Sequence, residues 1–276
     1  MPPARVVGLT VLAMLAFAGN SILCRAALRD TTIDAASFTT IRLIAGALTL
    51  ALIVRFRTSS PGKGNPLSAA ALFAYAAAFS FAYRSLTAAT GALLLFGAVQ
   101  TTMIGIGLWT GERLRPSQAV GLAAACAGLL FLLLPGLSAP PLAGALLMLA
   151  AGAAWGLYSL RGRGAGDPTT ITAGNFLYAS PFAIVLTLAT WPPGGLNTRG
   201  TLYALASGAL TSGVGYAVWY TALRGLRPTQ AAAIQLCVPV LVTLAGIIFL
   251  NEPLTTRLAL AAIAILGGIA LVMAKP

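Results

Sequence analysis

One charged side chain lies well inside a long apolar stretch of this chain, in the segment ASFTTIRLIAG at residues 36–46. This residue, Arg42, follows the start of the stretch by about nine positions, which is deep for a side chain that must reach the membrane surface. A cation at such a depth can pair with the carboxylate of a substrate, so Arg42 is a candidate binding residue. The alternative is a structural arginine that bridges helices or extends toward the outer surface.

Aromatic side chains recur at helical spacing in two separate stretches. Tyr75, Phe79 and Tyr83 are four residues apart and therefore share one face of a helix. Tyr216 and Trp219 form a second group much later in the chain. Aromatic faces accommodate apolar side chains and attract ammonium groups, so these residues are candidates for the wall of a substrate cavity. Such stripes also occur in ordinary helix packing and in interfacial belts.

Uncharged polar groups in the middle of other apolar stretches are further candidates. Pro239 has no N–H and should leave a carbonyl free near Gln235, which can distort the helix at that point. An amide or hydroxyl inside a membrane can instead hold two helices together. The candidate binding residues of this kind, with the aromatic and proline residues that accompany them, are Asn20, Gln100, Trp155, Tyr158, Gln235 and Pro239.

The groups needed for most enzyme and metal chemistry are missing from the interior of the apolar stretches. The chain has no histidine, and its three cysteines are far apart in sequence, so we expect no metal site and no cofactor. The five acidic residues all fall at the ends of apolar stretches: Asp30, Asp34, Glu112, Asp167 and Glu252. We therefore expect no catalytic residues, and a transport process that is facilitated and not proton-coupled.

The overall composition identifies the elements that must position these residues. Of the 276 residues, 58% are hydrophobic and only 8% are charged, too few charges to cover a soluble domain of this size. The net charge of +12 then reflects basic residues that flank membrane spans, so nucleic acid is not an expected partner.

Ten apolar stretches are long enough to cross a bilayer as helices. We expect an all-α integral membrane protein with spans near residues 6–25, 34–54, 67–83, 87–108, 117–134, 141–160, 169–190, 201–221, 228–250 and 257–274. Eleven cations lie between spans on the side of the N-terminus and five on the other side. The positive-inside rule therefore predicts that both termini are cytoplasmic.

An internal similarity links the two halves of the chain. The phrase TGERLRPSQ at 110–118 matches LNEPLTTRL at 250–258 with an offset of 140 positions that pairs Glu112 with Glu252. With small gaps the match extends to Tyr83 with Tyr220 and Phe17 with Trp155. We expect two five-helix repeats, at 1–136 and 137–276, which are inverted because five is an odd number. We expect both glutamates to accept backbone N–H groups at the start of the following helix.

Ten spans in this arrangement resemble the drug/metabolite transporter superfamily, and in particular its EamA-type exporters. The motifs that carry the resemblance are WG at 155–156, GE at 111–112 and NEP at 251–253. Within that family the chain looks most like exporters of aromatic and neutral amino acids of the YddG type. The first span has FAG where the family more often has WG, and the fourth has GAVQTTM in a region where the family often has proline.

The expected function follows from the resemblance together with the candidate residues. We expect a multi-pass protein of the bacterial inner membrane that exports aromatic and neutral amino acids and similar small metabolites by alternating access. Its expected partners are the small-molecule substrate and the lipid bilayer, as a monomer or a homodimer. The alternative is a carrier of lipophilic cations or drugs, or of nucleotide sugars, from the same superfamily. An embedded enzyme or a purely structural membrane protein fits the residues less well.

Overall fold

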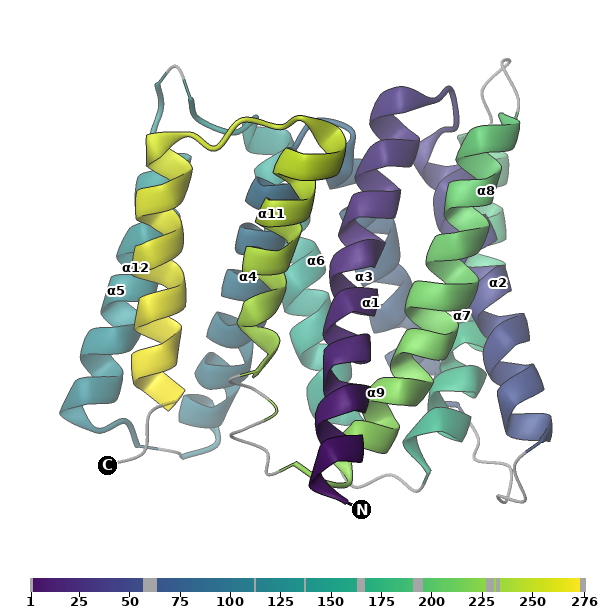
Figure 1. The fold of residues 1–276 in the computed structure, drawn as a ribbon, viewed down its shortest axis with the longest axis horizontal. Coiled ribbons are helices and arrows are strands. Elements are labelled where there is room, and N and C mark those ends of the chain that lie inside the picture. Colours follow the sequence, from purple (N-terminus) through teal and green to yellow (C-terminus); the bar gives the residue numbers. More distant parts are fainter. Residues whose placement is uncertain are drawn as a thin grey trace.

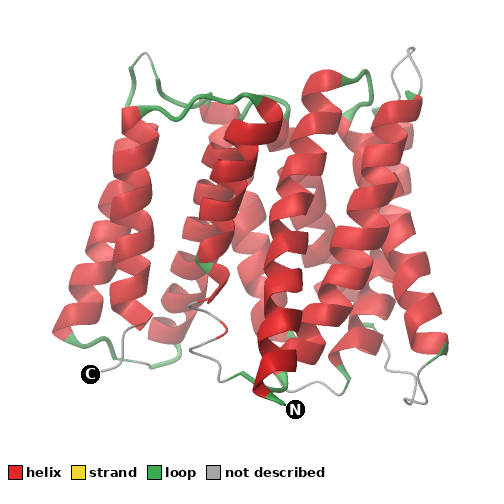
Figure 2. Ribbon diagram, in the orientation of Figure 1, coloured by secondary structure: helices red, strands yellow, loops and turns green. Residues whose placement is uncertain are grey.

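The computed structural model describes residues 2–56, 64–111, 113–136, 138–162, 167–190, 196–226, 231 and 234–273. Throughout these ranges the regular secondary structure is helical, with short turns between helices (Figure 2). Glu112, to which the sequence assigns a capping role, lies outside the described residues.

Eight helices are long and apolar enough to cross a membrane: α1 (Pro3–Asp30), α2 (Ala35–Arg55), α3 (Pro66–Tyr83), α4 (Ala88–Trp109), α5 (Pro116–Leu133), α6 (Leu142–Arg161), α7 (Pro168–Ala189) and α12 (Thr256–Met273). Three further segments run without a break from residue 198 to 223: α8 (Thr198–Ala206), the π-helix η1 (Ser207–Val214) and α9 (Gly215–Leu223). A shorter apolar helix, α11 (Cys237–Leu250), precedes α12. The chain is thus an all-helical integral membrane protein.

Polar side chains at the ends of the apolar runs determine where several helices begin. Asp34, Asn65, Thr87 and Asn197 each accept backbone N–H groups in the first turn of α2, α3, α4 and α8. These bonds satisfy donors that have no partner inside the helix. Proline occupies the first turn of α3, α5 and α7, where its missing N–H costs nothing.

The helices form a bundle in which segments that are distant in sequence pack together. α5 and α12 pair at one edge of the molecule, and α2 packs against α7 near the opposite edge (Figure 1). Between them, α6 packs against α3 and α4, while α1 packs against α9 and α11. The start of α1 and the end of α12 lie at the same end of the bundle (Figure 1).

The helix boundaries correct two expectations from the sequence. The expected ninth span at 228–250 is not one regular helix: Gln235 is helical, Leu236 is a turn, and α11 starts at Cys237. Pro239 is the third residue of α11, in the first turn, where a missing N–H costs nothing; it cannot donate to the carbonyl of Gln235, as a continuous helix would require. The expected eighth span at 201–221 contains the eight-residue π-helix η1, which hydropathy does not reveal.

The pairing of α5 with α12 depends on two facing glycines, and this allows a matched test. A Cβ atom at Gly268 would overlap the carbonyl oxygen of Gly121 and crowd the Ala125 backbone nitrogen, whereas a Cβ at Gly267 meets nothing within 4 Å. We expect Gly268→Ala to lower the thermal midpoint in detergent by about 5 °C, since overpacking costs about 1–3 kcal/mol. Gly267→Ala should leave it unchanged or raise it slightly; equal midpoints for the two variants would contradict this packing.

Candidate functional site

Two adjacent cavities lie inside the bundle. The smaller, which we call the inner cavity, has a volume of about 30 Å³, and the larger, which we call the vestibule, has about 720 Å³. They share the four lining residues Phe17, Trp155, Tyr216 and Gln235. The vestibule extends to the helix ends near Asn65, Arg161 and Pro168, at the end of the bundle that carries the termini (Figure 1). The inner cavity therefore adjoins a larger pocket that reaches one end of the bundle.

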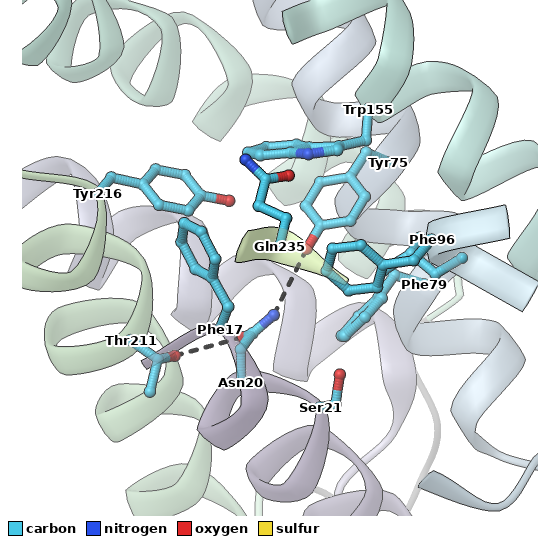
Figure 3. A pocket seen from close by; sticks show the side chains of 11 residues that line it. Phe17, Asn20, Ser21, Tyr75, Phe79, Phe96, Trp155, Thr211, Tyr216 and Gln235 are labelled. Carbon is cyan, nitrogen blue, oxygen red and sulfur yellow. Dashed lines mark hydrogen bonds between the residues drawn. The ribbon is translucent and has the colours of Figure 1, made fainter. Parts of the chain in front are cut away.

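Aromatic rings from several helices form the wall between the two cavities. Trp155 of α6 lies with its ring centroid 4.8 Å from Tyr75, 5.4 Å from Tyr216 and 5.3 Å from Tyr158. Phe17 of α1 meets Tyr216 edge-on at 5.8 Å. Figure 3 shows Phe17, Tyr75, Trp155 and Tyr216 around the amide of Gln235. Such a wall presents large apolar faces together with a few hydroxyl and amide groups.

A chain of hydrogen bonds runs through the base of the inner cavity. The Asn20 side-chain oxygen accepts from the Ser207 hydroxyl at 2.7 Å, and its Nδ2 donates to the Tyr75 hydroxyl oxygen at 3.4 Å (Figure 3 shows the latter). Thr211 Oγ1 lies 3.4 Å from the same Asn20 oxygen. Ser207 and Thr211 both belong to η1, so the π-helix supplies the groups that orient Asn20. π-Helical turns are frequent at functional sites.

Arg42 lies directly behind this base and is only 1% exposed. Its Nη2 donates to the Tyr75 hydroxyl at 3.1 Å and its Nε to the Ser212 hydroxyl at 3.2 Å, while the guanidinium lies over the rings of Phe79 at 5.1 Å and Tyr75 at 5.3 Å. Its Nη1 has no hydrogen-bond partner among the described residues.

The charge of Arg42 is not balanced by a neighbouring acid. Among the described residues the ion pairs join Arg25 with Glu252, Arg29 with Asp30, and Arg224 with Asp167, and none includes Arg42. Burying an unpaired charge is costly, so the protein retains Arg42 against a considerable energetic penalty. The π-helix η1 packs closely against the backbone of Arg42. This approach is possible because Gly208 has no side chain, and a Cβ there would overlap the Arg42 carbonyl.

The polar groups that line the vestibule are mostly neutral. Tyr158 lies within hydrogen-bond distance of Thr172, at 3.4 Å, and accepts from Asn175 at 3.3 Å. At the mouth, Arg161 donates to Asn65 at 3.2 Å and to Ser68 at 3.3 Å. No acidic side chain is among the described residues that line this cavity. The electrostatic field along the path from Arg161 to Arg42 therefore favours a negatively charged group.

The structure brings most of the predicted candidates together around these cavities. Those that line at least one of the two are Asn20, Tyr75, Phe79, Gln100, Trp155, Tyr158, Tyr216, Trp219 and Gln235. Arg42, Tyr83 and Pro239 are buried but are not among the lining residues. Tyr83 instead donates to the Ala88 carbonyl at 3.2 Å near the end of α3, and Pro239 shapes the helix break beside Gln235.

Several lining residues were not among the candidates, notably Phe17, Asn175, Arg161 and Thr211. Phe17 could have been found, because the internal repeat pairs it with Trp155 and both line both cavities. Thr211 gave no comparable signal, since its position depends on the unpredicted π-helix.

At the end of the bundle opposite the vestibule mouth, a group of contacts that we call the clasp ties three segments together. Glu252, just after α11, accepts from Arg25 Nε of α1 at 2.8 Å and from the Ala88 backbone N–H of α4 at 2.7 Å. Arg25 also donates to the Tyr83 carbonyl at 2.9 Å, and Arg29 donates to the Leu250 carbonyl at 2.7 Å. The glutamate thus does accept a backbone N–H, but at the start of α4 and not, as expected, at the start of α12.

A multi-span helical bundle with a central cavity open toward one surface and tied shut at the other defines a membrane transporter. Comparison with known proteins gives the family. The model of the EamA-like transporter family matches residues 142–274, and this chain belongs to that family, within the drug/metabolite transporter superfamily.

The chain is also similar to individual known proteins at several distances. The Pseudomonas aeruginosa protein PA1977 is 60% identical over 276 residues, which cover 99% of this chain and 96% of that protein. The threonine/homoserine exporter RhtA of Salmonella typhimurium is 30% identical over 196 residues, 63% of this chain and 64% of the exporter. RhtA of Escherichia coli K12 is also 30% identical, and the match covers 60% of its length. A solved crystal structure matches 97% of this chain with a TM-score of 0.70 at 19% identity, which concerns the fold alone.

Proposed function

We propose that this protein exports amino acids with aromatic or neutral side chains, and similar small metabolites, from the bacterial cytoplasm. The observation that carries the proposal is the vestibule of about 720 Å³, lined by aromatic and neutral polar groups, that leads toward the unpaired cation Arg42. A zwitterion can place its carboxylate toward the cation and its side chain and ammonium group against aromatic rings.

Relatives and lining chemistry favour amino acids over the other candidate substrates. The two RhtA relatives are named as threonine/homoserine exporters, although the match covers less than two thirds of their length. A carrier of lipophilic cations would need an acidic group in its cavity, and none lies among the described lining residues. A nucleotide sugar carries two phosphates, for which Arg161 and Arg42 offer few positive charges.

The proposed mechanism is alternating access between two inverted repeats, residues 1–136 and 137–276. The contact pattern supports this pairing of ten helical segments. α6 packs on α3 and α4 as α1 packs on α9 and α11, while α2 pairs with α7 and α5 with α12. Exchange of the two halves therefore leaves these main pairings unchanged. The helix break at Leu236 beside both cavities matches the discontinuous helices that many transporters use at the substrate site.

With both termini in the cytoplasm, as the distribution of cations predicts, the vestibule faces inward and the clasp closes the outer side. Release of substrate then requires the clasp to separate while the vestibule mouth closes. Asp30, Asp34, Asp167 and Glu252 lie at helix ends, and the described cavity lining has no acid to carry a proton. We therefore infer facilitated export down a concentration gradient, by a monomer or a homodimer.

Flux into proteoliposomes tests the proposal directly. We expect saturable transport of aromatic and neutral amino acids, with rates that change less than twofold when a pH gradient is imposed. Empty liposomes and liposomes with an unrelated membrane protein provide the background. Absence of flux for every amino acid in the panel would refute the proposed substrate class, and flux that concentrates substrate only under a pH gradient would refute facilitated export.

A further inference from the structure

Among the described polar residues that line the inner cavity, Tyr75 is the one that forms a hydrogen bond with Arg42. Its hydroxyl oxygen accepts from Arg42 Nη2 at 3.1 Å and from Asn20 Nδ2 at 3.4 Å, so both of its lone pairs face donors. Tyr75 also lines the inner cavity, and Figure 3 shows its hydroxyl close to the Asn20 amide at the base of that space. No acceptor for the hydroxyl proton is found among the described residues.

The two groups that donate to the Tyr75 oxygen cannot readily become acceptors of its proton. An arginine guanidinium has only donors, and it remains charged at every physiological pH. The Asn20 amide is oriented by Ser207, whose hydroxyl donates to its oxygen at 2.7 Å and so directs its NH₂ group toward Tyr75. A phenol that accepts from two donors, one of them a cation, becomes a stronger donor itself because hydrogen bonds in a chain polarise one another.

The side chain of Arg42 is also poorly placed to meet a substrate directly. It is 1% exposed and lies behind the rings of Tyr75 and Phe79. An anion in the inner cavity would meet the Tyr75 hydroxyl first. The cost of burying an unpaired guanidinium would then be offset when an anion arrives on the cavity side of that hydroxyl.

Resting on the proposed function, we propose that the Tyr75 hydroxyl is the donor that recognises the substrate carboxylate, and that Arg42 acts through it as a positioning and polarising residue. The substrate class that this assignment implies is the free amino acid with its carboxylate intact. Amides and esters of the same amino acids lack the charge that the polarised hydroxyl and Arg42 favour. Tyr75 therefore sets selectivity for the head group, while the aromatic wall contacts the side chain.

The test compares an amino acid with its own carboxamide in wild type and in Tyr75→Phe. Phenylalanine keeps the ring and removes the hydroxyl. We expect the apparent affinity for the amino acid to fall about 10- to 100-fold, as expected for the loss of a hydrogen bond to a charged group. The affinity for the carboxamide should change less than threefold. Tyr178→Phe, which removes a hydroxyl from an exposed position on α7, is the matched control and should behave as wild type.

The outcomes separate this inference from the proposed function. If wild type transports amino acids and Tyr75→Phe keeps both affinity and head-group selectivity, the role of Tyr75 is refuted while the export proposal stands. If wild type transports no amino acid, the export proposal itself fails. Should Tyr75→Phe not fold, 3-fluorotyrosine at position 75 gives a more acidic hydroxyl of nearly the same size. It should then bind the amino acid more tightly, and unchanged binding would overturn the proposal.

Discussion

Glu252→Gln should expose the buried thiol of Cys24 to reagents from the outer side of the membrane. Cys24 precedes Arg25 on α1, is 0% exposed and lies beside Ser80, between the clasp and the buried Arg42. In a variant that lacks Cys126 and Cys237, it is the one remaining cysteine of the chain. We expect a membrane-impermeant maleimide added outside to label it about 10- to 100-fold faster after the Glu252→Gln substitution.

The expected size follows from the burial of the ion pair. The Arg25 and Glu252 side chains are 12% and 7% exposed, so their interaction is poorly screened by solvent. Removal of one partner from a fully buried pair leaves an uncompensated charge and costs about 3–5 kcal/mol. Because both side chains here are partly exposed, we expect a smaller cost of about 1.4–2.8 kcal/mol, which corresponds to 10- to 100-fold. The outward-closed state loses that stabilisation, whereas a state in which Arg25 meets water does not. The population should therefore shift toward opening on the outer side.

Two further variants make the result specific. Asp30→Asn breaks the ion pair with Arg29, whose partners are 31% and 32% exposed, and should not change labelling because exposed pairs contribute little. The double variant Arg25→Gln/Glu252→Gln leaves no unpaired charge, so it should keep thermal stability and still label faster than wild type. Labelling of Cys24 at the wild-type rate in both clasp variants would contradict the role of the clasp as the outer closure.

The positions of most helices can be predicted from apolar runs in the sequence, because a bilayer requires long segments whose backbone groups are satisfied internally. What sequence patterns miss are changes of hydrogen-bond register. η1 forms where Gly208 lets the chain approach the Arg42 carbonyl closely, and hydropathy carries no information on such an approach. The sequence does predict a distortion near Leu236, because Pro239 leaves a free carbonyl near Gln235.

The depth of each residue in the membrane was harder to infer than the face it lies on. Tyr75, Phe79 and Tyr83 share a buried face, as their spacing predicts. A helix rises 1.5 Å per residue, so Tyr83 lies about 12 Å beyond Tyr75 along α3, past the inner cavity and at the clasp. The expected internal repeat gives better guidance, because it pairs Phe17 with Trp155, and both residues line both cavities.

Arg42→Gln should lower transport without lowering the thermal stability of the protein. A binding role and a structural role of Arg42 predict opposite changes in the thermal midpoint. Arg42 is fully buried, has no acidic partner among the described residues, and leaves Nη1 without a hydrogen bond. Replacing an uncompensated buried charge by a neutral amide removes a desolvation penalty, while glutamine can still donate to Tyr75 or Ser212. We therefore expect the thermal midpoint in detergent to stay the same or to rise.

Transport by Arg42→Gln should fall at the same time by about 100-fold, since the substrate carboxylate then loses the buried positive charge behind the Tyr75 hydroxyl, and the loss of a buried charge interaction costs about 2–5 kcal/mol. Arg25→Gln is the matched comparison, because it removes a paired arginine and should lower the midpoint. A structural Arg42 would give the reverse pattern, with a lower midpoint and flux reduced only in proportion to the folded protein. Near-normal apparent affinity for amino acids in a stable Arg42→Gln variant would show that the carboxylate is recognised without this cation.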